Sequence, residues 1–325
     1  MTSPSNTKWI LLSAAPLSDL YDQLRLRIPA GLILIEALGK QPLAVAAEQF
    51  RKVAESNCIV KLIAPVSLKN DEFRLLLIEQ SLHRTACWVY ESVTVENLLL
   101  LVEKFGQSDQ ASMQNADTSY EQQASIELQE LWLGKRDQLW APLLMALADE
   151  PQPVGLLSGS FNPLHTGHRQ LKNLAEEKLN GPVHYELPIH NADKPPLDYV
   201  SLYRRLSQFE EEPVLLSTAA TFVEKSELLS GVSFIIGADT AIRVVDPRFY
   251  ADERAMWEAF DLLKERNCRF LVASREVDGH LMEGSTLSLP EDAKALFDFI
   301  PTEEFCLNIS STELRKAEQS PFDLT

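Results

Sequence analysis

Apolar runs and stretches with helical spacing follow one another through the first 106 residues of the chain. Short apolar runs predict strands, whereas apolar residues that recur every three or four positions predict amphipathic helices. Strands are expected at 9–12, 31–35, 59–63 and 87–90, and helices at 18–26, 42–53, 70–82 and 94–106. Four successive strand–helix units are typical of a small α/β domain with a parallel, doubly wound sheet.

The middle of the chain has a different pattern. Residues 107–119 are polar and small, which is the composition of a linker. Between 120 and 148 the leucines and tryptophans fall on one helical stripe, which predicts a helix that Gly134 and Pro142 bend or break. We therefore expect three parts: a small α/β domain of unknown role at 1–106, a linker and helix at 107–150, and a larger domain at 151–325.

Strand signals return in the last part of the chain, again alternating with helical ones. The strand signals lie at 154–157, 183–187, 214–217, 234–237, 269–274, 299–301 and 306–309, and helical spacing is found at 169–179 and 201–209. This alternation predicts an open, mostly parallel sheet with crossover helices, which is a Rossmann-like doubly wound α/β fold. In such sheets, ligands bind beyond the carboxyl ends of the strands, at the point where the strand order reverses.

Composition and charge narrow the range of partners. The hydrophobic content of 45% and the charged content of 24% are those of an ordinary globular protein. A net charge of −17 provides no broad positive field for a nucleic-acid polymer, so a phosphate ligand must be held by local groups, which suits a mononucleotide. The polar start of the chain and its short apolar runs predict a cytoplasmic protein with no membrane partner. The four scattered cysteines form no Cys-x-x-Cys pair, so no zinc or redox motif is indicated.

Candidate chemistry begins at residues 155–168, where an apolar strand runs into a turn of small residues and then into a helix. A turn of this kind directs backbone N–H groups at one point, and the helix dipole adds positive potential there. His165 and His168 lie at the same point, and imidazole groups suit an oxygen that gains negative charge. The pattern therefore favours phosphate binding over the alternative, in which two histidines merely cap a helix.

A second cluster lies near the end of the chain. Ser310 or Ser311 can cap a helix, and Arg315 would project from the same end about one turn later. Its guanidinium can hold phosphate oxygens with two hydrogen bonds. Alone, this cluster would fit a capped helix with a surface arginine, but together with the histidine turn it favours a phosphate site.

Both clusters resemble the signatures of a known family. Gly159-x-Phe161-x-Pro163-x-His165-x-Gly167-His168 and Ser310-Ser-Thr312-x-x-Arg315 are similar to the motifs of the nucleotidyltransferases that carry His-x-Gly-His and have a cytidylyltransferase-like fold. The resemblance covers most of 154–317 and is closest to the nicotinamide- and nicotinate-nucleotide adenylyltransferase branch. The supporting residues are Lys194 beside two prolines, an arginine at 204 or 205, and Asp239 after Gly237-Ala.

The resemblance implies roles for individual residues. His165, His168 and Arg315 would be the catalytic groups that bind the ATP phosphates and the pyrophosphate leaving group. Lys194 would bridge the phosphates of both substrates, and Asp239 would accept hydrogen bonds from the ATP ribose. The full expected nucleotide-binding set is Gly159, Ser160, Phe161, Lys194, Gly237, Asp239, Ser310, Ser311 and Thr312.

The reaction implied by the resemblance is adenylyl transfer in NAD biosynthesis. The 5′-phosphate of a nicotinamide or nicotinate mononucleotide would attack the α-phosphorus of ATP, and pyrophosphate would leave without a covalent enzyme intermediate. We expect Mg²⁺ to arrive with ATP, held by phosphates and water, with no metal ligands from the protein. The expected partners are thus ATP and a mononucleotide, and homo-oligomer formation stays open.

Two alternatives stay open at this point. The same chemistry could serve another phosphorylated acceptor, such as phosphopantetheine. A protein of another class, a non-catalytic nucleotide-binding sensor or interaction protein, would bind the nucleotide without turnover. The sequence leaves the acceptor base and the preferred nucleoside triphosphate undecided.

Overall fold

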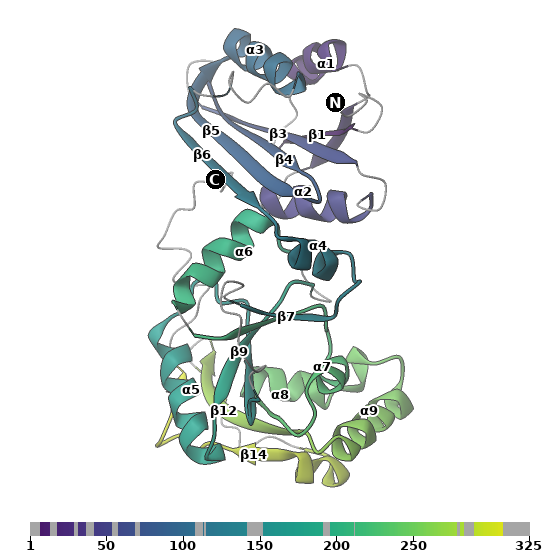
Figure 1. Ribbon diagram of the computed structural model, residues 1–325, viewed down its shortest axis with the longest axis vertical. Helices are drawn as coiled ribbons and strands as arrows, with labels where there is room; N and C mark the ends of the chain where they lie inside the picture. Colours follow the sequence, from purple (N-terminus) through teal and green to yellow (C-terminus); the bar gives the residue numbers. More distant parts are fainter. Residues whose placement is uncertain are drawn as a thin grey trace. The chain divides into compact units, whose positions relative to one another are not determined.

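The computed structural model describes residues 7–13, 18–28, 32–36, 42–53, 58–68, 72–107, 113, 115–141, 152–190, 196–210, 212–277, 280–282 and 289–307 (Figure 1). The chain divides into two compact units. Among the described residues, the first unit holds those up to 135 and 196–204, and the second holds those from 136 to 190 and from 205 to 307. In these described ranges, no helix is both long and apolar enough to cross a membrane.

The first unit is built on a mixed sheet with the strand order β2-β1-β3-β4-β5-β6. Its elements are β1 (Thr7–Ser13), α1 (Ser18–Arg27), β2 (Leu32–Glu36), α2 (Pro42–Arg51), β3 (Ile59–Ser67), β4 (Glu72–Gln80), β5 (Arg84–Thr94), α3 (Val95–Gly106), β6 (Thr118–Gln123) and α4 (Ile126–Trp132). The strand β1 pairs in parallel with β2 and β3, whereas β3 to β6 pair antiparallel. Figure 1 shows α1 and α3 on one side of this sheet and α2 on the other.

The predicted helix at 70–82 is wrong, because Glu72–Gln80 forms the central antiparallel strand β4. From Leu75 onward every residue of this strand is buried, so both faces are covered and the alternation that marks a half-buried strand is missing. A continuous apolar run of this length cannot be told from a buried helix by its periodicity. The expectation of a wholly parallel sheet in this part of the chain fails for the same reason. By contrast, the helix predicted at 94–106 is confirmed, with the Thr94 side chain accepting a hydrogen bond from the amide of Asn97.

The predicted helix at 120–148 is confirmed only over α4 (Ile126–Trp132), with the expected break at Gly134, and is wrong over the rest of the part that the structure describes. That part holds β6, the short helix α4, and β7 (Gln138–Ala141). The helix α4 ends because Gly134 adopts a left-handed conformation (φ 67°), and the amide of Lys135 then bonds back to the carbonyl of Glu130 at 2.9 Å. This arrangement is the Schellman motif, which glycine permits at low cost. Thr118 and Ser119, expected in a linker, pair with β5 as part of β6.

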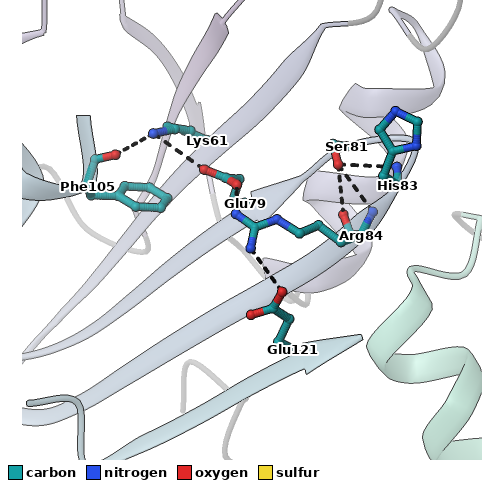
Figure 2. A network of polar contacts seen from close by, with 7 residues as sticks. All are labelled: Lys61, Glu79, Ser81, His83, Arg84, Phe105 and Glu121. Atoms are coloured by element: carbon teal, nitrogen blue, oxygen red, sulfur yellow. Dashed lines mark hydrogen bonds and ion pairs between the residues drawn. The ribbon is translucent and has the colours of Figure 1, made fainter. Parts of the chain in front are cut away.

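A chain of charged side chains, buried at Lys61 and Glu79 and exposed at Glu121, crosses the first sheet (Figure 2). The Lys61 side chain, on β3, donates to the carbonyl of Phe105 and forms an ion pair with Glu79 of β4 at 3.4 Å. Glu79 also pairs with Arg84 of β5, which in turn pairs with Glu121 of β6 at 3.0 Å. Burial lowers the pKa of Lys61, and the carboxylate of Glu79 acts against that shift. Charges of alternating sign thus join four neighbouring strands.

We expect Glu79→Gln to lower the free energy of unfolding by about 3 kcal/mol at pH 7, because it leaves the buried ammonium of Lys61 without its carboxylate. The substitution should also lower the pKa of Lys61 further. A lysine whose folded pKa lies below its unfolded value makes stability rise with pH, so the deficit should shrink between pH 7 and 10. Denaturant unfolding at several pH values measures both effects. The control is Glu121→Gln, which removes the exposed ion-pair partner of Arg84 and should lower the free energy of unfolding by less than about 1 kcal/mol. Equal losses in both variants would contradict the account.

The second unit contains a sheet with the strand order β13-β12-β11-β8-β9-β10-β7. Its elements after β7 are β8 (Gly155–Ser158), α5 (Thr166–Leu179), β9 (Val183–Pro188), the end of α6 (Tyr199–Leu206), η4 (Ser207–Phe209), β10 (Val214–Ser217), α7 (Phe222–Leu228), β11 (Ser233–Gly237), α8 (Ala238–Val244), η5 (Pro247–Phe249), α9 (Glu253–Glu265), β12 (Arg269–Val277), β13 (His280–Met282), η7 (Glu291–Leu296), β14 (Phe297–Phe299) and β15 (Cys306–Leu307). The strands from β12 to β10 are all parallel, and only β7 and β13 pair antiparallel among the described strands of this unit. This parallel-rich α/β arrangement is consistent with the expected Rossmann-like fold.

The strand order reverses at β8. From β8 the chain proceeds through β9 and β10 on one side of the sheet, and then returns to β11 and β12 on the other side. The segment after β8 therefore lies at the position where open α/β sheets bind their ligands. Phe234 of β11 and Phe270 of β12 share one hydrophobic core with residues of α8 and α9, among them Phe260. Tyr185, on β9, packs with Phe161 and Phe209.

Candidate active site

The turn that follows β8 is shaped by one buried ring. Phe161 is 1% exposed, and its ring packs edge-on against His168, Tyr185 and Phe209 with centroid distances of 5.1, 5.2 and 5.3 Å. A Cβ atom on Gly159 would lie 2.7 Å from this ring, so glycine is needed for the close approach. The backbone of Phe161 is left-handed (φ 43°), a strained conformation that the packing of its ring stabilises. The side chain of Phe161, a member of the expected nucleotide-binding set, thus lies in the core.

Gln208 holds the same turn from outside. Its Oε1 accepts from the backbone amide of Leu164 at 2.8 Å, and its Nε2 donates to the carbonyl of Phe161 at 3.0 Å. A single side chain therefore spans the turn with one accepted and one donated hydrogen bond. No motif in the sequence marks Gln208, because its role depends on a tertiary contact between η4 and the turn.

Arg205 makes a third connection to the turn. Its Nη1 donates to the carbonyl of Ser160 at 3.0 Å. Of the two arginines considered in the sequence, Arg205 is thus the one that contacts the turn, while the side chain of Arg204 is exposed. Ser160 and Gly159 are both half-buried.

The two histidines lie side by side at the start of α5. His165 is the residue that precedes the helix, and the rings of His165 and His168 stack with centroids 3.7 Å apart and an interplanar angle of 25°. The Nδ1 atom of His168 accepts from the backbone amide of His165 at 3.3 Å. An accepting Nδ1 assigns the proton of the neutral His168 ring to Nε2, which makes Nε2–H a donor.

This corner is therefore suited to an anion. In the first turn of α5, the amides of His165 and His168 already donate to Nδ1 of His168 and to the carbonyl of His165. The remaining first-turn amides and the dipole of this fourteen-residue helix give positive potential at that end. Two imidazole rings supplement these donors. The arrangement can bind phosphate oxygens and stabilise negative charge that develops on them.

The neighbouring strand brings Gly237 and Asp239 to the same edge of the sheet. The strand β11 pairs in parallel with β8, and Gly237 ends β11 and precedes α8. Asp239 lies in the first turn of α8 and is half-buried. The fold thus places a carboxylate beyond the end of the strand adjacent to the histidine turn, as the expected ribose contact requires.

The remaining predicted site residues lie outside the described residues. They are Lys194, Ser310, Ser311, Thr312 and Arg315. The last described strand before that final group, β15, pairs in parallel with β12 at Ser274 and Arg275. The convergence of Arg315 with the histidine turn stays a prediction.

The hydroxyl of Ser158 is a further polar group at the site, and no sequence motif marks it. The hydroxyl of Ser158, the last residue of β8, is buried and has no hydrogen-bond partner within the described part of the chain. Ser158 is in register with Glu186 of β9, whose carboxylate accepts from Lys225 at 2.6 and 2.7 Å and from Ser217. Side chains in register on neighbouring strands share a face, so this buried ion pair lies beneath the start of the turn.

Comparison with known proteins gives the class. Residues 156–317 match the family model described as Cytidylyltransferase-like. This part of the chain, which contains the turn, the histidines and Asp239, therefore belongs to the nucleotidyltransferase superfamily, and the match supports nucleotidyl transfer as the activity.

One similar protein is named for a more specific activity than the family as a whole. Over 172 residues the chain is 28% identical to a protein of Coprothermobacter proteolyticus named "Probable nicotinate-nucleotide adenylyltransferase". The match covers 50% of this chain and 81% of that protein. No solved structure matches the chain.

We expect Gly159→Ala to lower the free energy of unfolding by about 1 to 3 kcal/mol, because the new methyl group overlaps the enclosed ring of Phe161. In a Phe161→Leu background the same substitution should cost less, since the ring that it meets is gone. Denaturant unfolding of both single variants and the double variant measures this coupling. Additive effects would show that the ring and the glycine are not in the contact described.

Proposed function

We propose that the chain is an adenylyltransferase that joins the AMP part of ATP to nicotinate or nicotinamide mononucleotide and releases pyrophosphate. The observation that carries the proposal is the stacked pair His165 and His168 at the N-terminus of α5, located where the strand order reverses. The family match of the surrounding segment supports transfer of a nucleotidyl group, and the name of the similar protein supports the choice of acceptor.

In the proposed reaction, an oxygen of the mononucleotide 5′-phosphate forms a bond to the α-phosphorus of ATP. The bond from that phosphorus to the β-phosphate oxygen breaks, and pyrophosphate leaves with the electron pair. The Nε2–H of His168, the ring of His165 and the first amides of α5 would donate to the phosphate oxygens that gain charge. Because Phe161 and Gln208 hold the turn, these donors are in place before the substrate binds.

The proposal assigns the other residues by the family resemblance. Asp239 would bind the ribose of ATP, and Lys194 would bridge the phosphates of the two substrates. Arg315 and the serines before it would hold the pyrophosphate end. Ser160, whose carbonyl is bound by Arg205, would offer its amide or hydroxyl to the acceptor phosphate.

The proposed cofactor is Mg²⁺ that arrives with ATP. Within the described ranges, no three His, Cys, Asp or Glu side chains gather in a way that could hold a metal ion. The named groups of the turn are donors rather than carboxylate ligands, which fits a metal bound through phosphate oxygens and water. When bound, the ion would offset part of the negative charge of the triphosphate.

We expect the purified protein to release pyrophosphate from ATP and Mg²⁺ in the presence of nicotinate or nicotinamide mononucleotide. His168→Ala should lower kcat by about 100- to 1,000-fold, because it removes a donor to the charge that develops in the transition state. A coupled pyrophosphate assay measures both. The matched control is His83→Ala, which removes an exposed histidine of the first unit and should leave kcat unchanged.

Several results would contradict the proposal. Turnover with phosphopantetheine but neither mononucleotide would assign a different acceptor, and ATP binding without any turnover would assign a sensor. Wild-type kcat in the His168→Ala variant would remove that residue from the mechanism.

A further inference from the structure

Glu186, on β9, joins a buried ion pair to the turn of the candidate active site. The residue is fully buried, and its backbone carbonyl accepts from the amide of Gly159 at 3.0 Å. Gly159 comes directly after the last residue of β8, so this hydrogen bond lies where the paired strands end and the turn begins. Strand ends open more readily than strand centres, and β8 has only four residues. The position of the Glu186 backbone therefore affects where the turn starts.

Three donated hydrogen bonds fix the carboxylate of Glu186. The ammonium of Lys225, on α7, donates to its Oε1 and Oε2 atoms at 2.7 and 2.6 Å. The hydroxyl of Ser217, the last residue of β10, donates to the same Oε1 atom. Lys225 and Ser217 are both buried, so little water competes for these bonds. The carboxylate thus links the ends of β9 and β10 to α7.

The helix α7 is itself fixed at a second place. The guanidinium of Arg266, which follows α9, donates to the carbonyl of Val223 at 3.0 Å and to the hydroxyl of Ser226 at 2.8 Å. Lys225 lies between these two residues in the helix. The ammonium of Lys225 is therefore held by a helix that has little freedom to shift along the sheet.

A contribution to overall stability does not account for this ion pair. Removing two charges from water has a free-energy cost that their attraction often only offsets, and an apolar pair of similar volume is commonly as stable. An apolar pair, however, forms no directional bonds and would not fix the orientation of the Glu186 side chain. Glu186 is in register with Ser158 and is bonded to Gly159, so the orientation that the pair fixes is that of the residue beside the turn.

We infer that Glu186 and Lys225 are positioning residues for the turn that carries His165 and His168. Lys225 holds the side chain of Glu186, and the backbone of Glu186 holds the amide of Gly159, with which the turn begins. Both side chains act through the turn, because both are buried away from a ligand. The effect on rate rests on the proposed function, whereas the effect on the order of the turn does not.

The test replaces both charges together, in the double variant Glu186→Met/Lys225→Met, so that no unpaired charge is left in the core. Amide hydrogen exchange of the full-length protein is then followed peptide by peptide. Residues 158–170 should exchange about fivefold faster than in the wild type, a change of the size that one lost hydrogen bond produces. Residues 291–299, which hold η7 and β14 beside β12, should exchange at the wild-type rate, and the melting temperature should not fall.

Two further variants accompany the double variant. Lys178→Met/Glu304→Met removes another lysine–glutamate pair of the same unit, at the far end of α5, and should leave exchange over 158–170 unchanged. Ser217→Ala removes one donor to Glu186 but keeps the ion pair, and should accelerate exchange over 158–170 about twofold.

Activity gives a second readout if the proposed function holds. In Glu186→Met/Lys225→Met, kcat should fall about tenfold while KM for ATP changes less than about twofold, because donors to the charge of the transition state lose their positions. The Lys178→Met/Glu304→Met variant should keep the wild-type kcat.

Unchanged exchange over 158–170 in the double variant Glu186→Met/Lys225→Met would overturn the inference. Equal acceleration over 158–170 and 291–299 would overturn it as well, because the pair would then contribute only to overall stability. If this variant does not fold, Ser217→Ala decides: faster exchange over 158–170 but not over 291–299 supports the inference, and unchanged exchange overturns it. An absence of turnover in the wild type would refute the proposed function alone, since the exchange measurement needs no activity.

Discussion

The packing of the Phe161 ring beneath the turn after β8 is the constraint on which the candidate site depends. The ring lies within van der Waals reach of the space that a side chain on Gly159 would need, and it contacts the ring of His168. The burial of this ring stabilises the left-handed backbone conformation of Phe161, which is unfavourable for a residue with a side chain. The shape of the turn is thus decided by the hydrophobic core. A donor array held in this way needs no reorganisation when a phosphate arrives, which is the condition for efficient charge stabilisation.

The topology of the second unit then brings distant segments to that turn. Since β8 lies between β9 and β11, residues after three different strands meet at one edge of the sheet. The turn supplies donors and α8 supplies the carboxylate of Asp239. The polar clamp comes from Arg205 in the last turn of α6 and from Gln208 in η4. The order of the turn therefore depends on residues about 45 positions further along the chain, which no local motif connects to it.

The sequence predicts most strands of the second unit, because parallel strands buried on both faces form compact apolar runs bounded by polar turns. The prediction from sequence is wrong where the spacing of apolar residues does not correspond to the burial that the fold gives them. Glu72–Gln80 is enclosed on both faces and was expected as a helix, while the polar edge strand Thr118–Gln123 was expected partly as linker and partly as helix. The histidine turn could be found because glycine, proline and histidine have local requirements. Gln208 could not, since an ordinary glutamine gains its role only through tertiary hydrogen bonds.

The central claim is that the stacked imidazoles contact the triphosphate of ATP. The most direct measurement is an NMR titration of the histidine ring resonances with a non-hydrolysable ATP analogue and Mg²⁺. The chain has six histidines, and resonances are assigned with single substitutions. The account predicts saturable shifts of both His165 and His168 at one common dissociation constant, with His83 unmoved. Binding of the analogue that leaves both of these rings unshifted would contradict it.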